Sequence, residues 1–451
     1  MRTVTHDVPD YLIALIEALR RRLLDPNFLA RHRVRPQDFT RRCQLNFPVL
    51  MLFILQKSLK SIKNHLREFL DSLAPGEVFE SPQAGAVTHA RAKLKDSAFI
   101  ELNGDCVLPA AYDSEREVVR WRGHRLLGVD SSLMRLPNEQ AVGEVFGWQQ
   151  CSNQSGASGT AYPEARLSVL YDLLNGIGLG ARLESSRLGE VALAMEQLGH
   201  LRPGDAVVND RGFSGYVYFA RVLHHQGQFL GRCSSASFLT AQEMFRRNRA
   251  NQSQVVWLHA PAAQKAYCQR LGLPLKMKVR FVSLRLPTGD LEVLATSLLD
   301  EALYPTAEFL TVYHWRWSHE SFYLMLKGRL ETEHFSGRTV EAVRQDVHAA
   351  VLLANLESLL SEPTQERLDE ESAGRAHALQ VNRSVSYHAL KWKVLDLLYQ
   401  DVPAEEVLVQ LSQLFKESPV ALRPERTPPK RRKPSLARSL HFQRRVKTIA
   451  F

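Results

Sequence analysis

The central part of the chain alternates between short apolar runs and helical patterns, and this alternation restricts the possible folds most. From about Trp121, runs of strand length such as RLLGVD, RLSVLYDLL, DAVVND and FLGRCS are separated by Gly, Asn and Pro. Helical patterns lie between them, notably at residues 189–201 and 216–226. The order β, β, β, α, β, α, β predicts a mixed α/β sheet.

The flanking regions have a different texture. Apolar residues recur at helical spacing over residues 10–71, which predicts a helical N-terminal region. Residues 253–298 alternate as QVVWLHA, MKVRFVSLRLP and DLEVLATSLL, which predicts extra strands inserted before the next long helix. The C-terminal part is helical to about Leu414, and the last segment is rich in Pro and charge. Such a segment lacks a core and is expected to be disordered unless bound.

Composition predicts a soluble cytoplasmic protein of several parts. The chain has 451 residues, of which 45% are hydrophobic, enough for a substantial core. The longest uncharged apolar run, FPVLMLFILQ, is about half of the ~20 residues that a membrane span needs. The five cysteines are scattered and form no C-x-x-C pair, so neither a disulfide framework nor a zinc cluster is indicated.

Positive charge is concentrated at the two ends of the chain. Residues 1–70 hold thirteen Lys and Arg against six Asp and Glu, and residues 423–447 hold ten against one. The net charge of the whole chain is +10, so the middle is net negative. Basic blocks can be solvated tails, but two basic ends also suit a protein that binds a polyanion at several places. Nucleic acid is therefore the leading candidate partner.

The segment YHWRWSHESFYLMLK, residues 313–327, places charges on an otherwise apolar helix. On an α-helix, Arg316, Glu320 and Lys327 fall at about −60°, −20° and −40° from Tyr313, so all four share one face. Solvent-facing helices also carry charges at such spacings. Here, however, the neighbours Trp315, Phe322, Leu324 and Met325 are expected to be buried, so Glu320 needs a compensating cation or metal.

Two aspartates follow apolar strands and are candidate carboxylate partners for this glutamate. Asp130 ends RLLGVD, and Asp210 ends DAVVND and precedes Arg211. Acids also commonly close strands at turns. Asp172 and Asp205 serve as comparisons, and Asp205 fits a Pro-Gly-Asp turn that needs no catalytic role.

Three separated motifs resemble the DDE transposases of bacterial insertion sequences, in the group named after insertion sequence four. The signature Tyr-x2-Arg-x3-Glu-x6-Lys is present as Tyr313, Arg316, Glu320 and Lys327. VDSSLMRLP resembles the first-aspartate motif of this group, and NDRGF resembles the second. The resemblance covers roughly residues 35–395 and rests on four spaced residues together with two ordered aspartates.

The resemblance implies a ribonuclease-H-like catalytic domain in which Asp130, Asp210 and Glu320 bind two Mg²⁺ ions, which Mn²⁺ can replace. Oxygen ligands suit a hard cation, and two ions can stabilise both the attacking and the leaving oxygen of a phosphodiester displacement. Arg316 and Lys327 would hold phosphates, and Tyr313 would lie against the same DNA backbone. Arg211 and Arg232 align with recurrent arginines of the group and are further DNA-binding candidates, although salt bridges would explain them equally well.

The implied reaction is cleavage of element ends followed by attack of the freed 3′ hydroxyl on target DNA, cut-and-paste through hairpin ends. Double-stranded DNA, both element ends and target, is the expected partner, bound by a homodimer in the bacterial cytoplasm near the nucleoid. The group's hairpin-forming members stack a flipped base on an aromatic residue. The only tryptophan of the inserted strands is Trp257, early in the insertion, so no stacking residue is assigned.

These observations together predict an α/β fold: a ribonuclease-H-like mixed sheet with an inserted β-rich subdomain, plus helical N-terminal and C-terminal regions. The expected divisions are a helical DNA-binding domain (1–118), the catalytic domain (119–235 and 300–362), the β-rich insertion (236–299), a helical region (363–420) and a basic tail (421–451). The N-terminal domain, with VTHARAKL on one helix, would recognise the terminal inverted repeats.

Other signals and other functions stay open. GIGLG at residues 176–180 lacks the Lys-Ser/Thr of a phosphate loop, so a turn is expected. His224, His225 and Cys233 lack metal-ligand spacing, as do His314 and His319. Two functional alternatives remain. One is a transposase-derived DNA-binding regulator whose acids are dispensable, and the other is a plain nuclease that releases ends without joining them.

Overall fold

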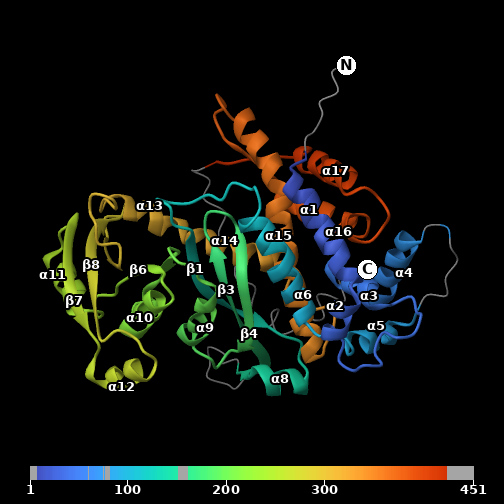
Figure 1. Ribbon diagram of the computed structural model, residues 1–451, viewed down its shortest axis with the longest axis horizontal. Helices are drawn as coiled ribbons and strands as arrows, with labels where there is room; N and C mark the ends of the chain where they lie inside the picture. Colours follow the sequence, from blue (N-terminus) through green and yellow to red (C-terminus); the bar gives the residue numbers. More distant parts are fainter. Residues whose placement is uncertain (1–7, 59, 75, 77–81, 151–160, 424–451) are drawn as a thin grey trace, which may run out of the picture. The chain divides into compact units, whose positions relative to one another are not determined.

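The computed structural model describes residues 8–58, 60–74, 76, 82–150 and 161–423. The chain divides into two compact units, which are described in turn (Figure 1). The helical unit consists of Met1–Glu117, Met134–Ala165 and Met325–Phe451, and the sheet unit consists of Val118–Leu133 and Arg166–Leu324. The predicted basic tail lies outside the described residues except for residues 421–423.

The helical unit contains the helices that the N-terminal and C-terminal apolar spacing predicts. In α1, Leu12, Leu15, Ile16 and Leu19 recur on one face and are buried. The apolar run FPVLMLFILQ forms the ten-residue helix α3. No helix of the described residues combines the length and the hydropathy needed to cross a membrane. The helices are α1 (Asp10–Leu24), α2 (Pro26–His32), α3 (Phe47–Gln56), α4 (Ile62–Leu73), α5 (Ala84–Arg91), α6 (Ser97–Leu102), α7 (Leu108–Tyr112), α8 (Gln140–Phe146), α15 (Val340–Glu371), α16 (Arg383–Leu398) and α17 (Ala404–Lys416).

The helix α15 is the longest helix of this unit and supplies much of its core. It has 32 residues and begins where the Thr339 side chain accepts a hydrogen bond from the Ala342 N–H. Three short strands complete the unit: β2 (Trp148–Gln149), and the pair β10 (Leu379–Gln380) and β11 (Val420–Ala421).

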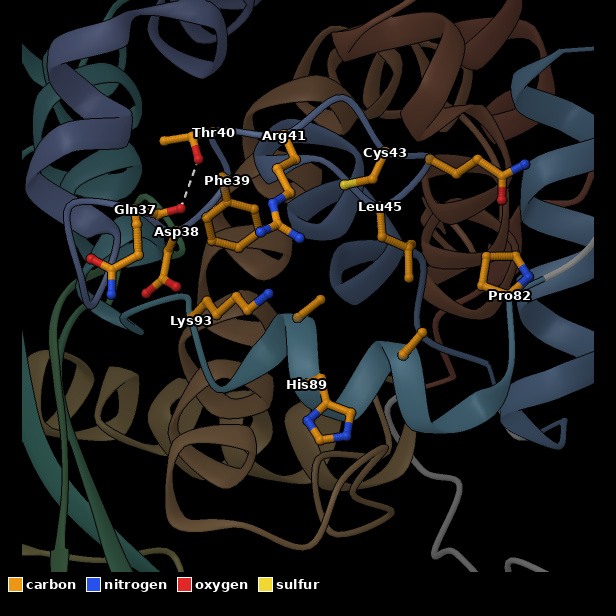
Figure 2. Close-up of a pocket in the computed structure, with 13 residues that line it drawn as sticks. Gln37, Asp38, Phe39, Thr40, Arg41, Cys43, Leu45, Pro82, His89 and Lys93 are labelled. Atoms are coloured by element: carbon orange, nitrogen blue, oxygen red, sulfur yellow. Dashed lines mark hydrogen bonds between the residues drawn. The ribbon is translucent and has the colours of Figure 1, made fainter.

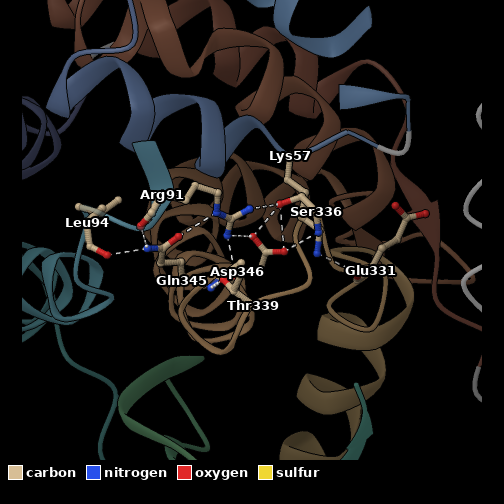
Figure 3. Close-up of polar contacts among 9 residues, drawn as sticks. Lys57, Arg91, Leu94, Glu331, Ser336, Thr339, Gln345 and Asp346 are labelled. Atoms are coloured by element: carbon tan, nitrogen blue, oxygen red, sulfur yellow. Dashed lines mark hydrogen bonds and ion pairs between the residues drawn. The ribbon is translucent and has the colours of Figure 1, made fainter. Parts of the chain in front are cut away.

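A buried polar network joins α15 to the end of α5 (Figure 3). The Arg91 guanidinium donates to Asp346 Oδ1 at 2.7 Å, to Gln345 Oε1 at 2.8 Å and to the Ala342 carbonyl at 2.8 Å. The Ser336 N–H donates to Asp346 Oδ2 at 2.6 Å. Arg91 is the arginine of VTHARAKL, and it is 4% exposed, so within this unit its role is to pair with Asp346.

One large mixed sheet carries the chemistry-bearing motifs. Its order is β2-β3-β1-β5-β6-β9-β8-β7, with β4 paired to β3. β1, β5 and β6 are mutually parallel neighbours, whereas β9 is antiparallel to β6. The strands are β1 (Leu126–Arg135), β3 (Tyr162–Asp172), β4 (Ile177–Ser185), β5 (Ala206–Asn209), β6 (Gln228–Arg232), β7 (Gln252–His259), β8 (Lys276–Arg285) and β9 (Leu291–Thr296). The expected mixed α/β fold is therefore confirmed.

The inserted strands β7, β8 and β9 continue this sheet outward from β6 (Figure 1). The three strands expected over residues 253–298 are present, and the helix α12 (Ala262–Arg270), which was not expected, lies between β7 and β8. That segment has neither the alternation of a strand nor a strong apolar stripe. The remaining helices of the sheet unit are α9 (Glu190–Gln197), α10 (Tyr216–His224), α11 (Leu239–Arg247) and α13 (Glu308–Trp315), and α14 (Trp317–Gly328) begins in this unit.

The GIGLG segment forms mostly strand. The turn at residues 173–176 includes only the first glycine of this segment, and β4 begins at Ile177. Gly176 has φ +71°, which only glycine adopts without strain. This first glycine of GIGLG therefore marks the end of the turn.

Candidate functional site

The strands β1 and β5 bring Asp130 and Asp210 to neighbouring positions. Gly128 of β1 pairs in parallel with Val208 of β5, so the same register places Asp130 beside Asp210 two residues further on. Asp210 directly follows β5, as expected. Asp130 does not end its strand, because β1 continues to Arg135, past the last residue of β5. Neighbouring strands are about 4.8 Å apart, so the two carboxylates are close to each other.

The environments of the two aspartates move their pKa values in opposite directions. Burial raises the pKa of Asp130, and the charges of Glu190 and Asp210 add to this effect. Burial also acts to raise the pKa of Asp210, but the Arg211 N–H, Arg316, Tyr313 and Arg232 together outweigh it, so the pKa of Asp210 is lowered. Asp130 is thus the less compensated carboxylate.

Residues 313–320 supply the counter-charge, and they form two helices. The helix α13 ends at Trp315 and α14 begins at Trp317, and Arg316 between them keeps helical backbone angles (φ −53°, ψ −30°). The Tyr313 hydroxyl donates to Asp210 Oδ1 at 3.1 Å, and the Arg316 guanidinium donates to Glu320 Oε1 at 3.1 Å. Arg316 is 6% exposed, and its charge also acts on both aspartates. The acids Asp130, Asp210 and Glu320 therefore gather around one buried arginine.

The predicted burial along these helices is only partly correct. Phe322 is buried at 3% exposure, but Leu324 is 73% exposed. Trp315 and Met325 are half-buried. On the same helical scale Leu324 lies at about +20° from Tyr313, so it belongs to the face of the charged residues and not to the buried face.

Arg232 and Arg211 have different surroundings. The Arg232 guanidinium pairs with Glu292, a residue of β9 that is 4% exposed, and lies 3.7 Å from Asp210 Oδ1. Arg232 therefore adds positive charge beside Asp210 while its own charge is paired. Arg211 is exposed, and its backbone N–H donates to the Asp210 carboxylate.

Lys327 falls in the part of α14 that belongs to the helical unit. Its ammonium lies 3.5 Å from Glu333 Oε1 of the same unit. Its predicted phosphate-binding role stays a prediction.

Sequence reasoning missed Tyr323, which lies three residues after Glu320 on α14. The Tyr323 hydroxyl donates to the Asp130 carbonyl at 2.8 Å and accepts from the Val169 N–H at 3.0 Å. Tyr323 is 6% exposed, and its ring stacks on His319, which is fully buried. Burial lowers the pKa of His319 to about 3, so this histidine is neutral. The i, i+3 spacing of Glu320 and Tyr323 was the available signal.

Sequence reasoning also missed Glu190, a charged residue whose carboxylate acts on Asp130. Glu190 Oε1 accepts from the Ser131 hydroxyl at 2.9 Å and from Arg166 at 2.5 Å. Glu190 opens the first turn of α9, where negative charge is favourable. Its carboxylate contributes to the raised pKa of Asp130.

The donor set fits a hard divalent cation, although the side chains do not form a closed cage. Within the described ranges, no three His, Cys, Asp or Glu side chains are arranged so that they could hold a metal ion. The three carboxylates nevertheless lie around one positively charged side chain, that of Arg316. The pKa of Asp130 stays raised, so its negative charge is not fully balanced by neighbouring positive charge. Carboxylate oxygens are the ligands that Mg²⁺ and Mn²⁺ prefer.

The helical unit contains a separate groove of about 780 Å³ (Figure 2). It lies between residues 37–45 and α5, and its lining includes the cationic or titratable side chains of Arg41, His89 and Lys93. Phe39 on its wall has φ +59°, an uncommon conformation for an aromatic residue. None of the three predicted catalytic acids lines this groove.

Comparison with known proteins agrees with the class of protein that the mixed sheet and its acids suggest. Residues 121–356, slightly more than half of the chain, match the family described as "Transposase DDE domain". The chain therefore belongs to this transposase family. No curated protein matches the sequence. One similar solved structure is that of a piggyBac transposase synaptic complex with hairpin DNA. The aligned part covers 89% of this chain and 85% of the piggyBac chain, with 8% sequence identity and a TM-score of 0.42.

Proposed function

We propose that this chain is an active DNA transposase of the insertion sequence four group, which cuts the ends of its element and joins the freed 3′ ends to target DNA. The observation that carries the proposal is the convergence of Asp130, Asp210 and Glu320 around Arg316 inside the family-matched region. A ribonuclease-H-like catalytic domain over residues 119–235 and 300–362, interrupted by the insertion at 236–299, is part of this proposal.

Asp130, Asp210 and Glu320 would hold two Mg²⁺ ions. When bound, such ions lower the pKa of the attacking water and neutralise charge on the phosphate. The salt bridge with Arg316 occupies Oε1 of Glu320, and an approaching phosphate would favour the release of this oxygen because phosphate and carboxylate compete for the same guanidinium. The protein's own contribution is to place three acids and one arginine at a single sheet edge.

The basic and aromatic residues would then position the DNA backbone. Arg316 suits a bidentate phosphate contact, and Lys327 a point-charge contact. Tyr313 holds Asp210 by its hydroxyl, so it orients a carboxylate whatever its contact with DNA. Arg211 is exposed and free to reach a phosphate, whereas Arg232 would act mainly through its charge, since Glu292 holds its guanidinium.

DNA-end recognition would belong to the N-terminal helical region, residues 1–118. The groove beside α5 is the candidate surface, because Arg41, His89 and Lys93 line it and the exposed α5 residues Gly85 and Thr88 are small (Figure 2). A homodimer on paired ends and cut-and-paste through hairpin ends complete the proposal, and the tail at 421–451 would add phosphate contacts.

A labelled element-end duplex tests this proposal. Wild-type protein with Mg²⁺ should yield nicks, then hairpins and joined products on a denaturing gel. Asp210→Asn should abolish all three products, whereas Asp290→Asn, an exposed acid on the turn before β9, should leave them unchanged.

The outcomes separate the alternatives. Binding of the end without any cut would indicate a regulator. Cuts without joined products would indicate a nuclease. Equal cutting by wild type and Asp210→Asn would refute the assignment of the acids.

A further inference from the structure

The inserted region, residues 236–299, has four exposed arginines near one end of its strands. Arg246 and Arg247 lie in the last turn of α11, Arg249 follows, and Arg285 ends β8. We propose that these four residues, the arginine rim, bind the backbone of duplex DNA about five or six base pairs from the cleavage position. This inference rests on the proposed function, because it takes the cleavage position to be at Asp130, Asp210 and Glu320.

Strand register places the rim at the same edge of the sheet as Asp210. The parallel register of β5 and β6 aligns Asp210 with Arg232. Arg232 pairs with Leu294 of β9, Leu294 with Val282 of β8, and Val282 with Ser253 of β7. Arg285 lies three residues beyond Val282, and Arg249 lies four residues before Ser253. Both residues are therefore displaced from this row in the direction in which β5 runs, which is the end of the sheet where Asp210 lies.

The distance between the acids and the rim follows from sheet geometry. Three strand spacings separate β5 from β8, which gives about 14 Å across the sheet. Three residues along β8 add about 10 Å in the perpendicular direction. The resulting separation of roughly 17 Å corresponds to about five base pairs of duplex at 3.4 Å each. The rim is thus too far away to touch the reacting phosphate and suitably placed for flanking DNA.

The rim is held rigidly but keeps exposed charge. Arg285 donates to Asn248 Oδ1 at 3.1 Å and to the Asn248 carbonyl at 2.9 Å, which fixes the end of α11 to β8. Asn248 has φ +48° and ends the helix in a left-handed conformation. Arg247 pairs with Glu243 on the surface. For Arg246 and Arg249, the described part of the chain provides no side-chain partner.

The exposed guanidinium groups of Arg246 and Arg249, which have no partner among the described residues, are suited to phosphate. A phosphate contact replaces condensed counterions on the DNA, so the contact is sequence-independent and weakens as salt rises. Arg246 and Arg247 also complement the C-terminal end of the α11 dipole, a stabilising role that needs no DNA. Only a binding measurement with DNA of defined length separates these two roles.

The test uses two double charge reversals in the full chain. The rim variant is Arg246→Glu with Arg249→Glu. The control variant is Lys265→Glu with Arg270→Glu, both exposed on α12 beyond the other end of β7, so the two proteins have the same net charge. Binding is measured with Ca²⁺ on a duplex that extends about fifteen base pairs on both sides of the cleavage position, and on duplexes cut back to about three base pairs on one side or the other.

The rim variant should bind the long duplex about tenfold more weakly, and its slope of log K against log salt should be shallower by about 2. On one of the two shortened duplexes the rim variant should bind with the same affinity as wild type. The control variant should bind every duplex with the same affinity as wild type. Equal slopes for the rim variant and wild type would overturn the inference. So would an equal loss on all duplexes, or an equal loss in the control. Cleavage with Mg²⁺ is scored separately from binding. If the rim variant shows the expected loss of binding but the wild type never cuts the duplex, the proposed function alone is refuted.

Discussion

At the residue scale, Asp130 is held at two of its atoms by different neighbours. Its carboxylate accepts from the Ser131 N–H at 2.7 Å, and its carbonyl accepts from the Tyr323 hydroxyl at 2.8 Å. The second contact joins the strand of one predicted catalytic acid to the helix of another, Glu320. The Tyr323 hydroxyl therefore links the strand of Asp130 directly to the helix of Glu320.

Tyr323→Phe should loosen this spacing. The substitution leaves the Asp130 carbonyl and the Val169 N–H without this partner, which should cost about 1–3 kcal/mol of unfolding free energy, measured in urea. The Mn²⁺ concentration needed for half-maximal cleavage should also rise several-fold. Tyr216→Phe removes a similarly buried hydroxyl that donates to the Pro274 carbonyl at 2.8 Å, and it should lower stability without changing the Mn²⁺ requirement. A Tyr323→Phe protein with an unchanged requirement would assign this tyrosine to stability only.

Asp130 itself should couple metal binding to stability. At Mn²⁺ about five times its dissociation constant, binding stabilises the folded state by about 1 kcal/mol. For a chain of this size the melting temperature should rise by about 1–2 °C. In Asp130→Ala this rise should vanish, as followed by calorimetry. A rise of equal size in the variant would count against Asp130 as a ligand.

At the element scale, strand β1 and helix α14 pack closely because Gly128 has no side chain. A Cβ atom at this position would lie 2.8 Å from Leu173 Cδ2 and 3.3 Å from His319 Nδ1. His319 precedes Glu320, and Gly128 lies two residues before Asp130. The absence of a side chain at Gly128 therefore allows β1 to approach both Leu173, which follows β3, and the helix that carries Glu320.

Gly128→Ala should separate the two elements. Overpacking at this contact should cost about 1–3 kcal/mol in urea unfolding and reduce cleavage. Gly104→Ala, where an added Cβ meets no atom within 4 Å, should leave stability unchanged or raise it. If Gly128→Ala were as stable and active as wild type, the packing of β1 against α14 would not control the site.

At the scale of the whole molecule, the stability of the helical unit depends on a buried ion pair between distant segments. Asp346 and Arg91 are 1% and 4% exposed and 255 residues apart. Burial acts to raise the pKa of Asp346, but Arg91, Lys57 and the Ser336 N–H together lower it. A lowered pKa in the folded state means that Asp346 contributes stability above its unfolded pKa of about 3.9, and that this contribution is lost as pH falls through the folded pKa.

Asp346→Asn should leave Arg91 buried without its counter-charge. The expected cost is about 3 kcal/mol at pH 7, from urea unfolding. The variant should also lose less stability than wild type between about pH 4 and pH 2, because the group that titrates has been removed. Asp369→Asn makes the same change at an exposed position of α15 and should alter neither quantity by more than about 0.5 kcal/mol. A parallel pH dependence in wild type and Asp346→Asn would contradict the assignment.

The elements could be predicted from local pattern, and the contacts between them only in part. Apolar runs of strand length predicted β1, β3, β5 and β6 because alternation and punctuation are properties of consecutive residues. The helix α12 and the break at Arg316 were missed, since neither has a strong periodic signal. The extension of β1 past Asp130 was missed because SSLMR carries few apolar residues.

The sequence did not allow us to predict which side chains pair with each other. Nothing near Arg91 in the chain indicates that it pairs with Asp346, and nothing near Arg232 indicates that it pairs with Glu292. Tyr323 reads as a core aromatic, although its hydroxyl binds the Asp130 carbonyl. Such contacts depend on which segments pack together, and no local pattern contains that information.

By itself, the sequence determined which residue types stand at which spacing: two acids after apolar runs, and a tyrosine, an arginine and a glutamate within eight positions of one helical segment. Only the tertiary structure decided that these groups meet around Arg316, that Glu292 pairs with Arg232, and that the inserted strands continue the main sheet and bring four arginines to the edge of Asp210. The physical reason is that propensity and periodicity act over a few residues. The compensation of a buried charge depends on every chain segment that folding brings within a few ångströms of it.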